Sequence, residues 1–497
     1  MGATSIPSPT GGWNARDSRD QMAPTDAVKL VNWIARAGYC ETRKGSSVHG
    51  TALGGTVESL IAFRGPATSK LLACANGNIW NITTAGAGVS IKAGLANNLW
   101  NDTHHSGKVI MCNGANTPQV YDGTTIADIV VTGVTATTLW GLNNYKGRVF
   151  YWAQNSQSFW YAAANSYQGA LTEFKLERIA RRGGSLVQMV TWTLDAGDGV
   201  NDLAAFVMST GEVLIYQGDD PGAATSWALS GSFSLGEPIN IRAHARVSGT
   251  EIIITKDGYV DLGKAINGGR YTEESAYSYK IIRAAKDAAV QYSAITGWGC
   301  LLYPAGNLFI VNIPISTTES IQHVRDTTNG GWTQFAGWNI RSMAVHGDKL
   351  YFGDSTGVVY LADTGTNDNN VAIYTEAIPA FNPLGSRASK KQLTAASVVS
   401  SYLNPKNWVL DGLADFNLAT RSPLNTETIS GASAWDVATW DVDPWGASTT
   451  EPQAGPRAWR NVRANGYAIT CSIRLQLISQ TVVWFSTAYL FKPAGAI

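Results

Sequence analysis

Short apolar segments, separated by turn-forming residues, recur along most of the sequence, and they come in pairs. In the first pair, residues 71–74 and 79–82 flank Asn76-Gly77. Asn-Gly and Asp-Gly favour the tight turns of β-hairpins, because both central positions of such turns often need a positive φ. The same arrangement is found in the apolar pairs 109–112 and 119–121, 148–152 and 159–161, 205–208 and 213–216, 252–255 and 259–260, 308–311 and 322–324, and 351–352 and 358–361. The pattern predicts an all-β protein built from hairpins.

The spacing of these hairpins is typical of a β-propeller. Their first strands begin near residues 71, 109, 148, 205, 252, 308 and 350. This spacing brackets the ~40–50 residues of a four-stranded blade. A single hairpin cannot bury both faces, whereas blades stacked around an axis can. We therefore predict a propeller of six to eight blades, with seven favoured by the seven hairpins. A large β-sandwich also repeats hairpins and is the alternative.

Two segments depart from the hairpin pattern. A short helix between blades is predicted where apolar residues recur at helical spacing, at Ile281, Ala285, Ala288, Ala289 and Tyr292. A polar linker at residues 364–370 precedes alternating segments at 469–475 and 481–485. The predicted organisation is therefore an extended N-terminal arm (1–50), a propeller (51–365) and a C-terminal β-sandwich-like domain (366–497).

The composition fits short strands joined by turns. Of 497 residues, 51 are Gly and 18 are Trp, and only 15% are charged, against a typical figure of about 25%. Lys and Arg together number 37, as do Asp and Glu, so the balance gives no basic footprint for nucleic-acid binding. A duct for moving DNA is still compatible with this balance, because it should not grip phosphates tightly.

The chain shows neither a secretion signal nor an apolar run of the roughly 20 residues that cross a bilayer. Its five cysteines are scattered without a C-x-x-C pair (Cys40, Cys74, Cys112, Cys300, Cys471). We expect folding in a reducing cytoplasm, no membrane anchor and free buried thiols.

No sequence motif indicates catalysis or metal binding. The H-E-x-x-H, G-x-S-x-G and G-K-[ST] signatures are missing from the sequence. His104 and His105 are adjacent, but neighbouring strand residues point to opposite faces, so a shared metal is not expected. The sequence therefore predicts no catalytic, cofactor-binding or metal-binding residue, and a protein that is not an enzyme.

Carboxylates are the main rival signal, because glycan-hydrolysing propellers use paired acids. Asp195, Asp198 and Asp202 cluster, and Asp219-Asp220 ends a hairpin, but Asp is an ordinary turn residue. The stretch from Asp326 to Trp332 resembles the Asp-box turn of sialidase propellers, yet it occurs once and that turn is structural. A glycan hydrolase is therefore the least favoured hypothesis.

Three motifs near the N-terminus carry a family resemblance: Gly11-Gly12-Trp13-Asn14, Asn32-Trp33 and Arg43-Lys44-Gly45. They resemble the opening of the tail nozzle and packaged-DNA stabilisation proteins of short-tailed phages. The segment from Gly331-Trp332 to Tyr360 is similar to the last blade of that family. Trp435-Asp436, Trp440-Asp441 and Trp445 resemble a Trp-Asp ladder in the C-terminal domains of such proteins. The resemblance favours a strand at residues 28–32, where a helix capped by Thr25 is the local alternative.

This resemblance implies a structural virion protein at the distal end of a phage tail. Such a protein closes the tail channel, retains packaged DNA and lets it out on infection. The implied partners are five further copies in a homo-hexamer, the adaptor ring beneath the portal, tail fibres or spikes, and DNA that transits without sequence-specific binding. The alternative is a receptor- or glycan-binding tail propeller that uses exposed aromatics such as Trp152, Phe159, Trp160 and Tyr161. We favour a core position for these four residues.

Overall fold

The computed structural model describes residues 1–193, 202–267, 272–401, 408–418, 458–477 and 480–493. Strands dominate, and the chain divides into two units. The propeller unit comprises Ser47–His323 and Trp338–Ala362. The sandwich unit comprises Met1–Ser46, Val324–Gly337 and Asp363–Ile497. No helix in the described residues is both long and apolar enough to span a bilayer.

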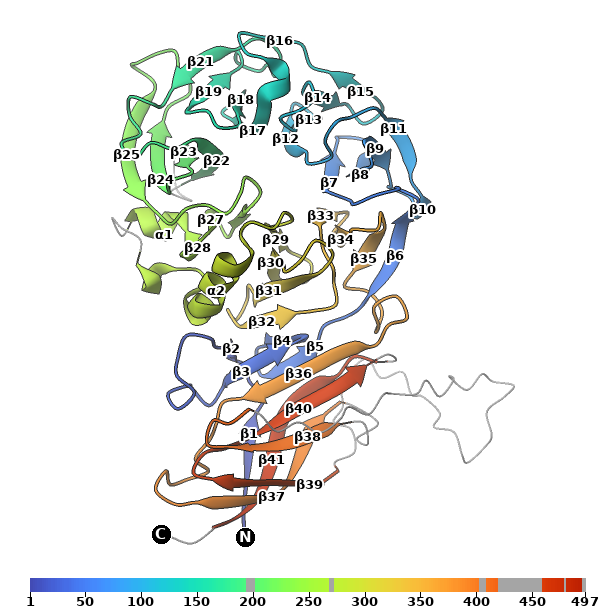
Figure 1. Ribbon diagram of the computed structural model, residues 1–497, viewed down its shortest axis with the longest axis vertical. Coiled ribbons are helices and arrows are strands. Elements are labelled where there is room, and N and C mark those ends of the chain that lie inside the picture. The colour runs from blue at the N-terminus through green and yellow to red at the C-terminus, as the bar shows by residue number, and fades with distance from the viewer. Residues whose placement is uncertain (194–201, 268–271, 402–407, 419–457, 478–479, 494–497) are drawn as a thin grey trace, which may run out of the picture. The chain divides into compact units, whose positions relative to one another are not determined.

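Seven blades surround the axis of the propeller unit in the described part of the chain (Figure 1). The first four are β7 (Ser59–Arg64), β8 (Ser69–Ala75), β9 (Asn78–Asn81) and β11 (Val89–Lys92); β12 (Asn101–His105), β13 (Lys108–Cys112), β14 (Gln119–Tyr121) and β15 (Ile126–Asp128); β17 (Leu139–Tyr145), β18 (Arg148–Ala153), β19 (Ser158–Tyr161) and β21 (Thr172–Lys175); and β22 (Leu186–Thr193), β23 (Asp202–Met208), β24 (Glu212–Gln217) and β25 (Ala228–Ser234). The others contain β26 (His244–Val247), β27 (Thr250–Thr255) and β28 (Gly258–Asp261); β29 (Gly299–Tyr303), β30 (Leu308–Pro314) and β31 (Ser320–Asp326); and β33 (Ser342–His346), β34 (Lys349–Gly353) and β35 (Val359–Ala362). The predicted all-β propeller with seven blades is confirmed.

The seventh blade closes the ring with a strand from the start of the propeller sequence. Its order is β33, β34, β35, then β6 (Ser46–Thr51), with β10 (Gly86–Ala87) beyond β6. The innermost strand β33 contacts β7 of the first blade. The ring is therefore held shut by strand pairing between segments from its two ends.

The predicted hairpins form the second and third strands of the blades. Asn76 and Gly77 adopt the expected positive φ, at 50° and 70°. The innermost strands were not predicted, because several are polar. The strand β12, for example, reads Asn-Asp-Thr-His-His. Two short strands, β16 (Val131–Thr132) and β20 (Gly169–Ala170), form a separate parallel pair.

The predicted helix exists as α2 (Ile282–Tyr292), and it buries Ile282, Ala285, Ala288 and Ala289. The fifth blade has three strands, and a helical segment follows β28. That segment contains α1 (Leu262–Asn267), η2 (Glu273–Ser275), η3 (Tyr279–Ile281) and α2, whereas η1 (Ala136–Thr138) precedes β17. The sequence pattern predicted α2 alone.

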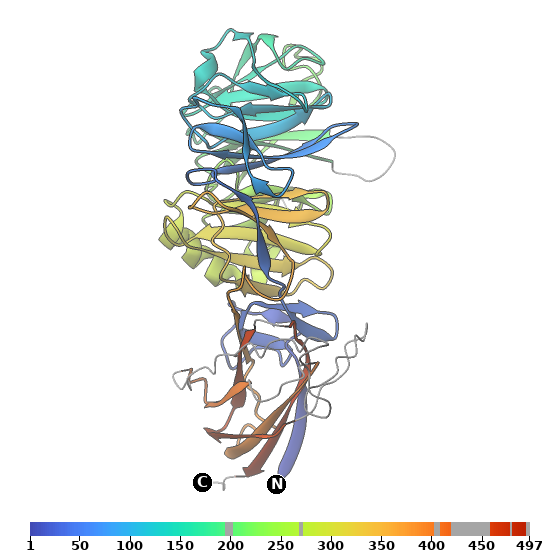
Figure 2. The ribbon, with the colours of Figure 1, turned by 90° about the vertical axis from the view of Figure 1, so that its right-hand side faces the viewer.

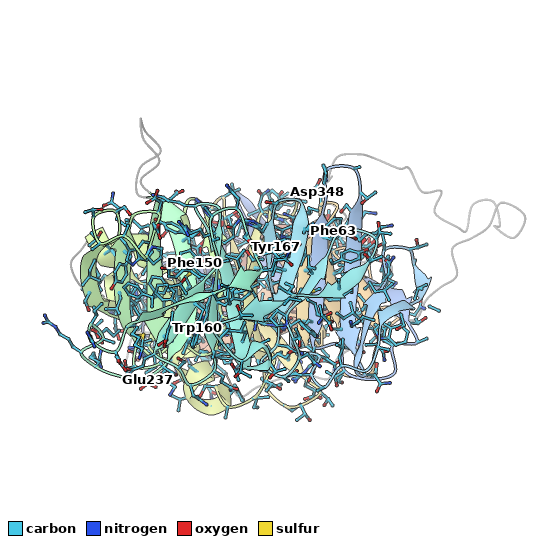
Figure 3. The ribbon with its side chains drawn as sticks, turned by 90° about the horizontal axis from the view of Figure 1, so that it is seen from above. Phe63, Phe150, Trp160, Tyr167, Glu237 and Asp348 are labelled. Carbon is cyan, nitrogen blue, oxygen red and sulfur yellow. The ribbon has the colours of Figure 1, made fainter. Side chains whose placement is uncertain are left out.

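Aromatic side chains fill the space between the third and fourth blades. Phe159 stacks on Phe206 with ring centroids 4.6 Å apart, and Trp152, Phe159 and Tyr161 are buried. Trp160 is half-buried. Figure 3 shows Phe150 among the strands, while the exposed residues Asp348 and Glu237 lie at opposite margins. The predicted core position is confirmed for the three buried residues.

Two sheets pack face to face in the sandwich unit. One contains β1 (Gly2–Pro7), β4 (Trp33–Arg36), β5 (Tyr39–Thr42), β37 (Lys391–Ser400), β39 (Arg460–Gly466) and β41 (Val483–Pro493). The other contains β2 (Gly12–Trp13), β3 (Asp26–Val31), β32 (Trp332–Phe335), β36 (Ile373–Pro379), β38 (Val409–Ala414) and β40 (Ile469–Leu477). Trp33 is central to the core between them, with ring centroids 5.6 Å from Trp484 and 6.3 Å from Trp408.

The sequence prediction separated an arm at 1–50 from a domain at 366–497, but the structure places residues 1–46 and 363–497 in one unit with Val324–Gly337. The first strand, β1, pairs antiparallel with β41, and β3 pairs antiparallel with β36 (Figure 2). An extended segment gains main-chain hydrogen bonds by joining a sheet. Of the strand predicted at residues 28–32, residues 28–31 lie in β3, whereas Asn32, at φ 58°, interrupts the chain between β3 and β4. Trp435, Trp440 and Trp445 lie outside the described residues.

Candidate functional site

Two of the N-terminal motifs meet at Arg43 in the sandwich unit, where its side chain is buried and bonds to Asn32. Nη1 and Nη2 donate to the Asp368 carboxylate at 2.9 and 2.6 Å. Nε donates to Asn32 Oδ1 at 2.9 Å, and Nη2 also donates to the Ala336 carbonyl at 2.8 Å. A bidentate guanidinium–carboxylate pair of this kind adds geometric specificity to the electrostatic attraction. Arg43 thus ties together chain segments that are far apart in sequence.

Asn32 occupies the same cluster. Its side-chain amide donates to the carbonyls of Ala336 and Tyr374 at 3.1 and 2.7 Å. Its side-chain oxygen also accepts from the Ala336 amide at 2.9 Å. The left-handed backbone conformation of Asn32 is one that Asn tolerates better than most residues. Asn32 therefore serves both the turn between two strands and the Arg43 cluster.

Two motif glycines lie where no side chain fits. A Cβ on Gly12 would lie 2.6 Å from the amide nitrogen of Trp332, and φ there is +80°. A Cβ on Gly45 would lie 1.8 Å from the carbonyl oxygen of Asn367. We define the motif cluster as Gly12, Asn32, Arg43, Gly45 and Trp332.

The Asp-box-like turn has a structural role in the sandwich unit. Asp326 accepts from the amides of Thr328 and Asn329 at 2.7 and 2.9 Å, and it forms an ion pair with Arg36. Burial alone would raise the pKa of Asp326, but these hydrogen bonds and Arg36 hold it below its ordinary value. The Asp326 carboxylate therefore accepts hydrogen bonds from its own turn and stabilises that turn.

The other residues singled out in the sequence do not assemble into a reaction centre among the described residues. His104 is exposed and His105 is buried, on opposite faces of β12 as predicted. In the described ranges, no three His, Cys, Asp or Glu side chains could hold one metal ion. Asp202 begins β23, and Asp220 pairs with Arg148 at 3.2 Å. Asp195 and Asp198 lie outside the described residues. All five cysteines are free, and only Cys300 among them is not fully buried.

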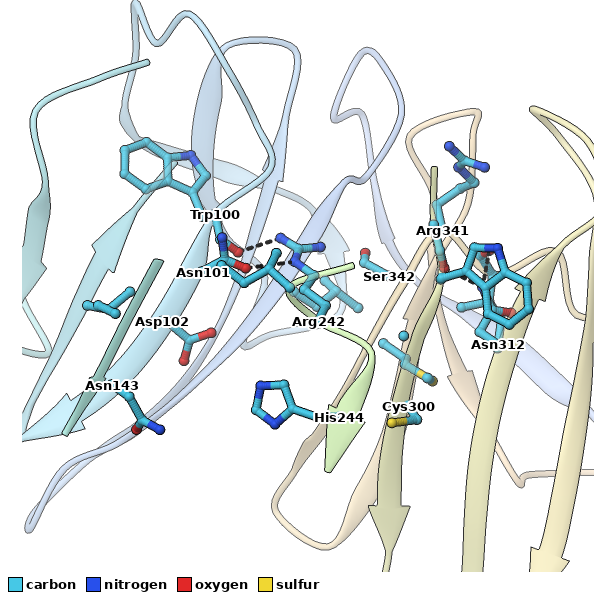
Figure 4. Close-up of a pocket in the computed structure, with 18 of the residues that line it drawn as sticks. Trp100, Asn101, Asp102, Asn143, Arg242, His244, Cys300, Asn312, Arg341 and Ser342 are labelled. Carbon is cyan, nitrogen blue, oxygen red and sulfur yellow. Dashed lines mark hydrogen bonds between the residues drawn. The ribbon is translucent and has the colours of Figure 1, made fainter. Parts of the chain in front are cut away.

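The propeller unit contains a cavity of about 260 Å³ at the centre of its ring (Figure 4). Its walls come mainly from the beginnings of the innermost strands and the residues just before them. The polar part of the lining consists chiefly of Asn101, Asp102, Asn143, Arg242, His244 and Arg341. These residues interrupt the apolar pattern, which is the one sequence signal that could have marked the site.

Arg242 crosses the channel beside this cavity. Nη1 donates to the Glu58 carbonyl at 2.6 Å, and Nη2 donates to Ser59 Oγ and to the Trp100 carbonyl. Nε donates to Asn101 Oδ1 at 3.4 Å. Burial lowers the pKa of Arg242, and nearby Asp102 acts in the opposite direction. The guanidinium links the fifth blade to the first and second blades.

A circle of hydrogen bonds from side chain to main chain joins each blade to the next at this level. The pairs are Ser59 with Trp100 (3.4 Å), Asn101 with Trp140 (2.8 Å), Asn143 with Met189 (2.8 Å), Gln188 with Asn240, Asn240 with Trp298 (3.1 Å), Asn312 with Ile340 (3.0 Å) and Ser342 with Val57 (2.7 Å). In each pair the side chain of the first residue donates to the carbonyl of the second. The polar lining of the channel thus stabilises the order of the blades.

No family model and no curated protein matches the chain. Among solved structures, YCF48 from Cyanidioschyzon merolae is 9% identical with a TM-score of 0.39, over 64% of this chain and 98% of that one. PorZ, a surface component of the type-IX secretion system of Porphyromonas gingivalis, is 11% identical with a TM-score of 0.39, over 67% and 42%. The computationally designed Ika8 protein is 11% identical with a TM-score of 0.36, over 64% and 99%. The propeller assignment rests on the seven blades of the chain itself.

Proposed function

We propose that this chain is a structural protein of a short-tailed phage tail, which closes the tail channel, retains packaged DNA and releases it on infection. The observation that carries this proposal is that residues of the nozzle-like motifs make buried structural contacts within one unit, above all the bond between Arg43 and Asn32. Arg43 bonds to Asn32, and both bond to the Ala336 carbonyl, whereas Gly12 packs on Trp332 elsewhere in the same unit.

The channel of the propeller is unsuited to carrying DNA. Arg242 crosses the centre of the ring and bonds the fifth blade to the first and second, so this side chain would obstruct a passing duplex. In our proposal the DNA lumen lies between subunits of a homo-hexamer, held by head-to-tail contacts around a closed ring. The adaptor ring beneath the portal templates this hexamer, and tail fibres or spikes attach to it. The protein acts without catalysis, and its location is the virion tail.

Genome retention tests this proposal. Particles assembled without the protein should package DNA and then lose it, so nuclease-protected DNA should fall with time. Complementation with the wild-type chain or with the Arg463→Gln variant should restore retention, because Arg463 is exposed. Complementation with Arg43→Met should not restore it, because that variant removes the centre of the motif cluster. Particles that keep their genomes without the protein would contradict the proposal.

A receptor- or glycan-binding tail propeller is the second candidate, and the polar cavity of the propeller unit favours it. Under this alternative, particles that lack the protein keep their DNA and fail to adsorb to cells. Adsorption and nuclease protection measured on the same particles separate the two functions.

A further inference from the structure

Trp459 is a large apolar side chain that its own unit leaves half uncovered. Among the tryptophan side chains that the structure describes, it is the only exposed one, at 53% of its surface. It directly precedes β39, which lies at the edge of its sheet. Tryptophan is enriched in interfaces between proteins. Trp459 is therefore a candidate anchor for a partner of the sandwich unit.

A pocket with aromatic walls lies in the same unit. Phe381, Phe416, Tyr467 and Ala468 line it, and its volume is about 220 Å³. The ring centroids of Phe381 and Phe416 are 5.1 Å apart. A cavity of about 150 Å³ accommodates benzene, so this pocket has room for the larger indole ring. We call it the aromatic pocket.

Asp415 brings an exposed carboxylate to the aromatic pocket. Its Oδ1 accepts from the amides of Tyr467 and Ala468 at 2.7 and 3.1 Å, which holds the turn after β38 against the turn after β39. Its Oδ2 has no hydrogen-bond partner within the described ranges. An indole N–H usually finds an acceptor when its ring is buried. Apolar walls and one acceptor together match a tryptophan side chain.

Trp459 cannot enter the aromatic pocket of its own chain. Tyr467, in the wall of the pocket, directly follows β39, whereas Trp459 directly precedes it. The 7 residues of β39 separate the two positions by about 25 Å, at roughly 3.3 Å per residue. This distance is far beyond the reach of an indole side chain. The tryptophan that fits the pocket therefore comes from a second copy of the chain.

We propose that Trp459 of one copy inserts into the aromatic pocket of the next copy, with its ring against Phe381 and Phe416 and its indole N–H on Asp415. A protruding group and a pocket at different places on one surface can join copies head to tail, and such contacts close into rings. The inference rests on the proposed function for the six-membered ring, and it names the residues that join its subunits. Tryptophan anchors in desolvated pockets carry much of the binding energy of an interface.

Photo-crosslinking of the purified full chain tests the contact. Replacing Trp459 by p-benzoylphenylalanine keeps a large aromatic group, and irradiation at high protein concentration should give an adduct between chains at Phe416 or Tyr467. Ala468→Phe fills the pocket and Tyr467→Ala removes one wall, so each should lower the yield by at least about tenfold. The matched control places the photoreactive residue at Val371, which is 65% exposed in the same unit, and it should give no adduct in the pocket.

Three outcomes would overturn the proposal: no adduct between chains, an adduct that maps outside the aromatic pocket, or a yield that neither pocket variant changes. Tyr467→Ala gives an independent measurement if Ala468→Phe unfolds, because Tyr467 is exposed. The crosslink needs no phage particle, so its result is separate from genome retention. A pocket adduct in a protein whose absence leaves DNA retention intact would support the contact between copies and reject the closing of the tail.

Discussion

Arg242 donates a hydrogen bond of 2.6 Å from Nη1 to the main-chain carbonyl of Glu58, which belongs to a blade that is not adjacent to its own. Most bonds at the centre of the ring join neighbouring blades, but this guanidinium reaches across the channel. Its acceptors are mainly main-chain carbonyls and hydroxyl or amide oxygens of the first two blades. A substitution here would leave these oxygens without their donor.

We expect Arg242→Gln to lower the free energy of unfolding of the propeller unit by about 2–4 kcal/mol, since it removes hydrogen bonds from a charged group. Amide hydrogen exchange in β7 and β12 should accelerate accordingly. Arg246→Gln should change exchange little, because Arg246 is exposed. Equal exchange rates in the two variants would show that the cross-channel bonds contribute no stability.

The Arg43–Asp368 pair leads to a prediction for the sandwich unit. Arg43→Met leaves the Asp368 carboxylate without its buried partner, and breaking such a pair costs about 3–5 kcal/mol. Urea denaturation followed by hydrogen exchange in β4 and β5 measures the loss. Arg463→Gln removes an exposed Arg from the same unit and should leave the transition within about 0.5 kcal/mol of the wild type.

Two glycines of the sandwich unit should lose stability to different extents on substitution by alanine. Gly45→Ala places a Cβ 1.8 Å from the Asn367 carbonyl, so the backbone must shift and we expect a loss of at least about 3 kcal/mol. Gly38→Ala meets open space at φ +88° and should cost only about 1–2 kcal/mol. Thermal unfolding of both variants measures the difference, and a larger loss for Gly38→Ala would contradict the clash.

The buried His323 should make stability depend on pH. Burial lowers the pKa of His323 from 6.5 to about 3, so between these values the unfolded chain binds a proton that the folded chain does not. Stability is therefore lost as the pH falls through this window, by about 1.4 kcal/mol per pH unit. His323→Asn keeps a side-chain acceptor for Tyr259, whose hydroxyl lies 2.8 Å from Nδ1.

Urea denaturation at pH 7 and pH 5 measures this effect. Between the two values, the wild type should lose about 2 kcal/mol more than His323→Asn. Equal losses would mean that His323 titrates alike in the folded and unfolded chains.

All five cysteines should react with a thiol reagent once the chain is denatured. Thiol titration without prior reduction should find five thiols, as all five are free in the structure. In the native protein Cys300 should react first, because the other four are fully buried. Burial raises the pKa of Cys300 well above its ordinary value, so even this reaction should be slow at pH 7. Fewer than five thiols in the denatured chain would indicate a disulfide.

Local patterns predicted the hairpins, because a turn such as Asn76-Gly77 and its flanking strands carry their own signal. The innermost strands carry a weaker signal. In β12, Asn101 is polar because it bonds to the Trp140 carbonyl in the next blade, a partner that no local pattern reveals. The seventh blade was incompletely predicted for the same reason, since β6 pairs with β35 from the far end of the ring.

The candidate sites were harder to predict from the sequence than the strands, because their residues meet only through long-range contacts. Arg43 was singled out only through a family resemblance, and nothing in the sequence links it to Asp368, 325 residues away. Arg341 and Asp102 attracted no attention as sequence positions, because an isolated Arg or Asp at the start of a strand is common. Only the closed ring brings both to one cavity.

The pairing of β6 with β35 also sets the order of events on the ribosome. Strand β6 is synthesised before any complete blade, and its partner β35 is synthesised after the strands of the other six blades. An unpaired strand edge is a template for pairing with another chain. In a nascent chain that stalls before Val359, β6 therefore lacks its partner, and its free edge can pair with the β35 segment of a neighbouring copy. Complete synthesis is the step that makes each ring self-contained.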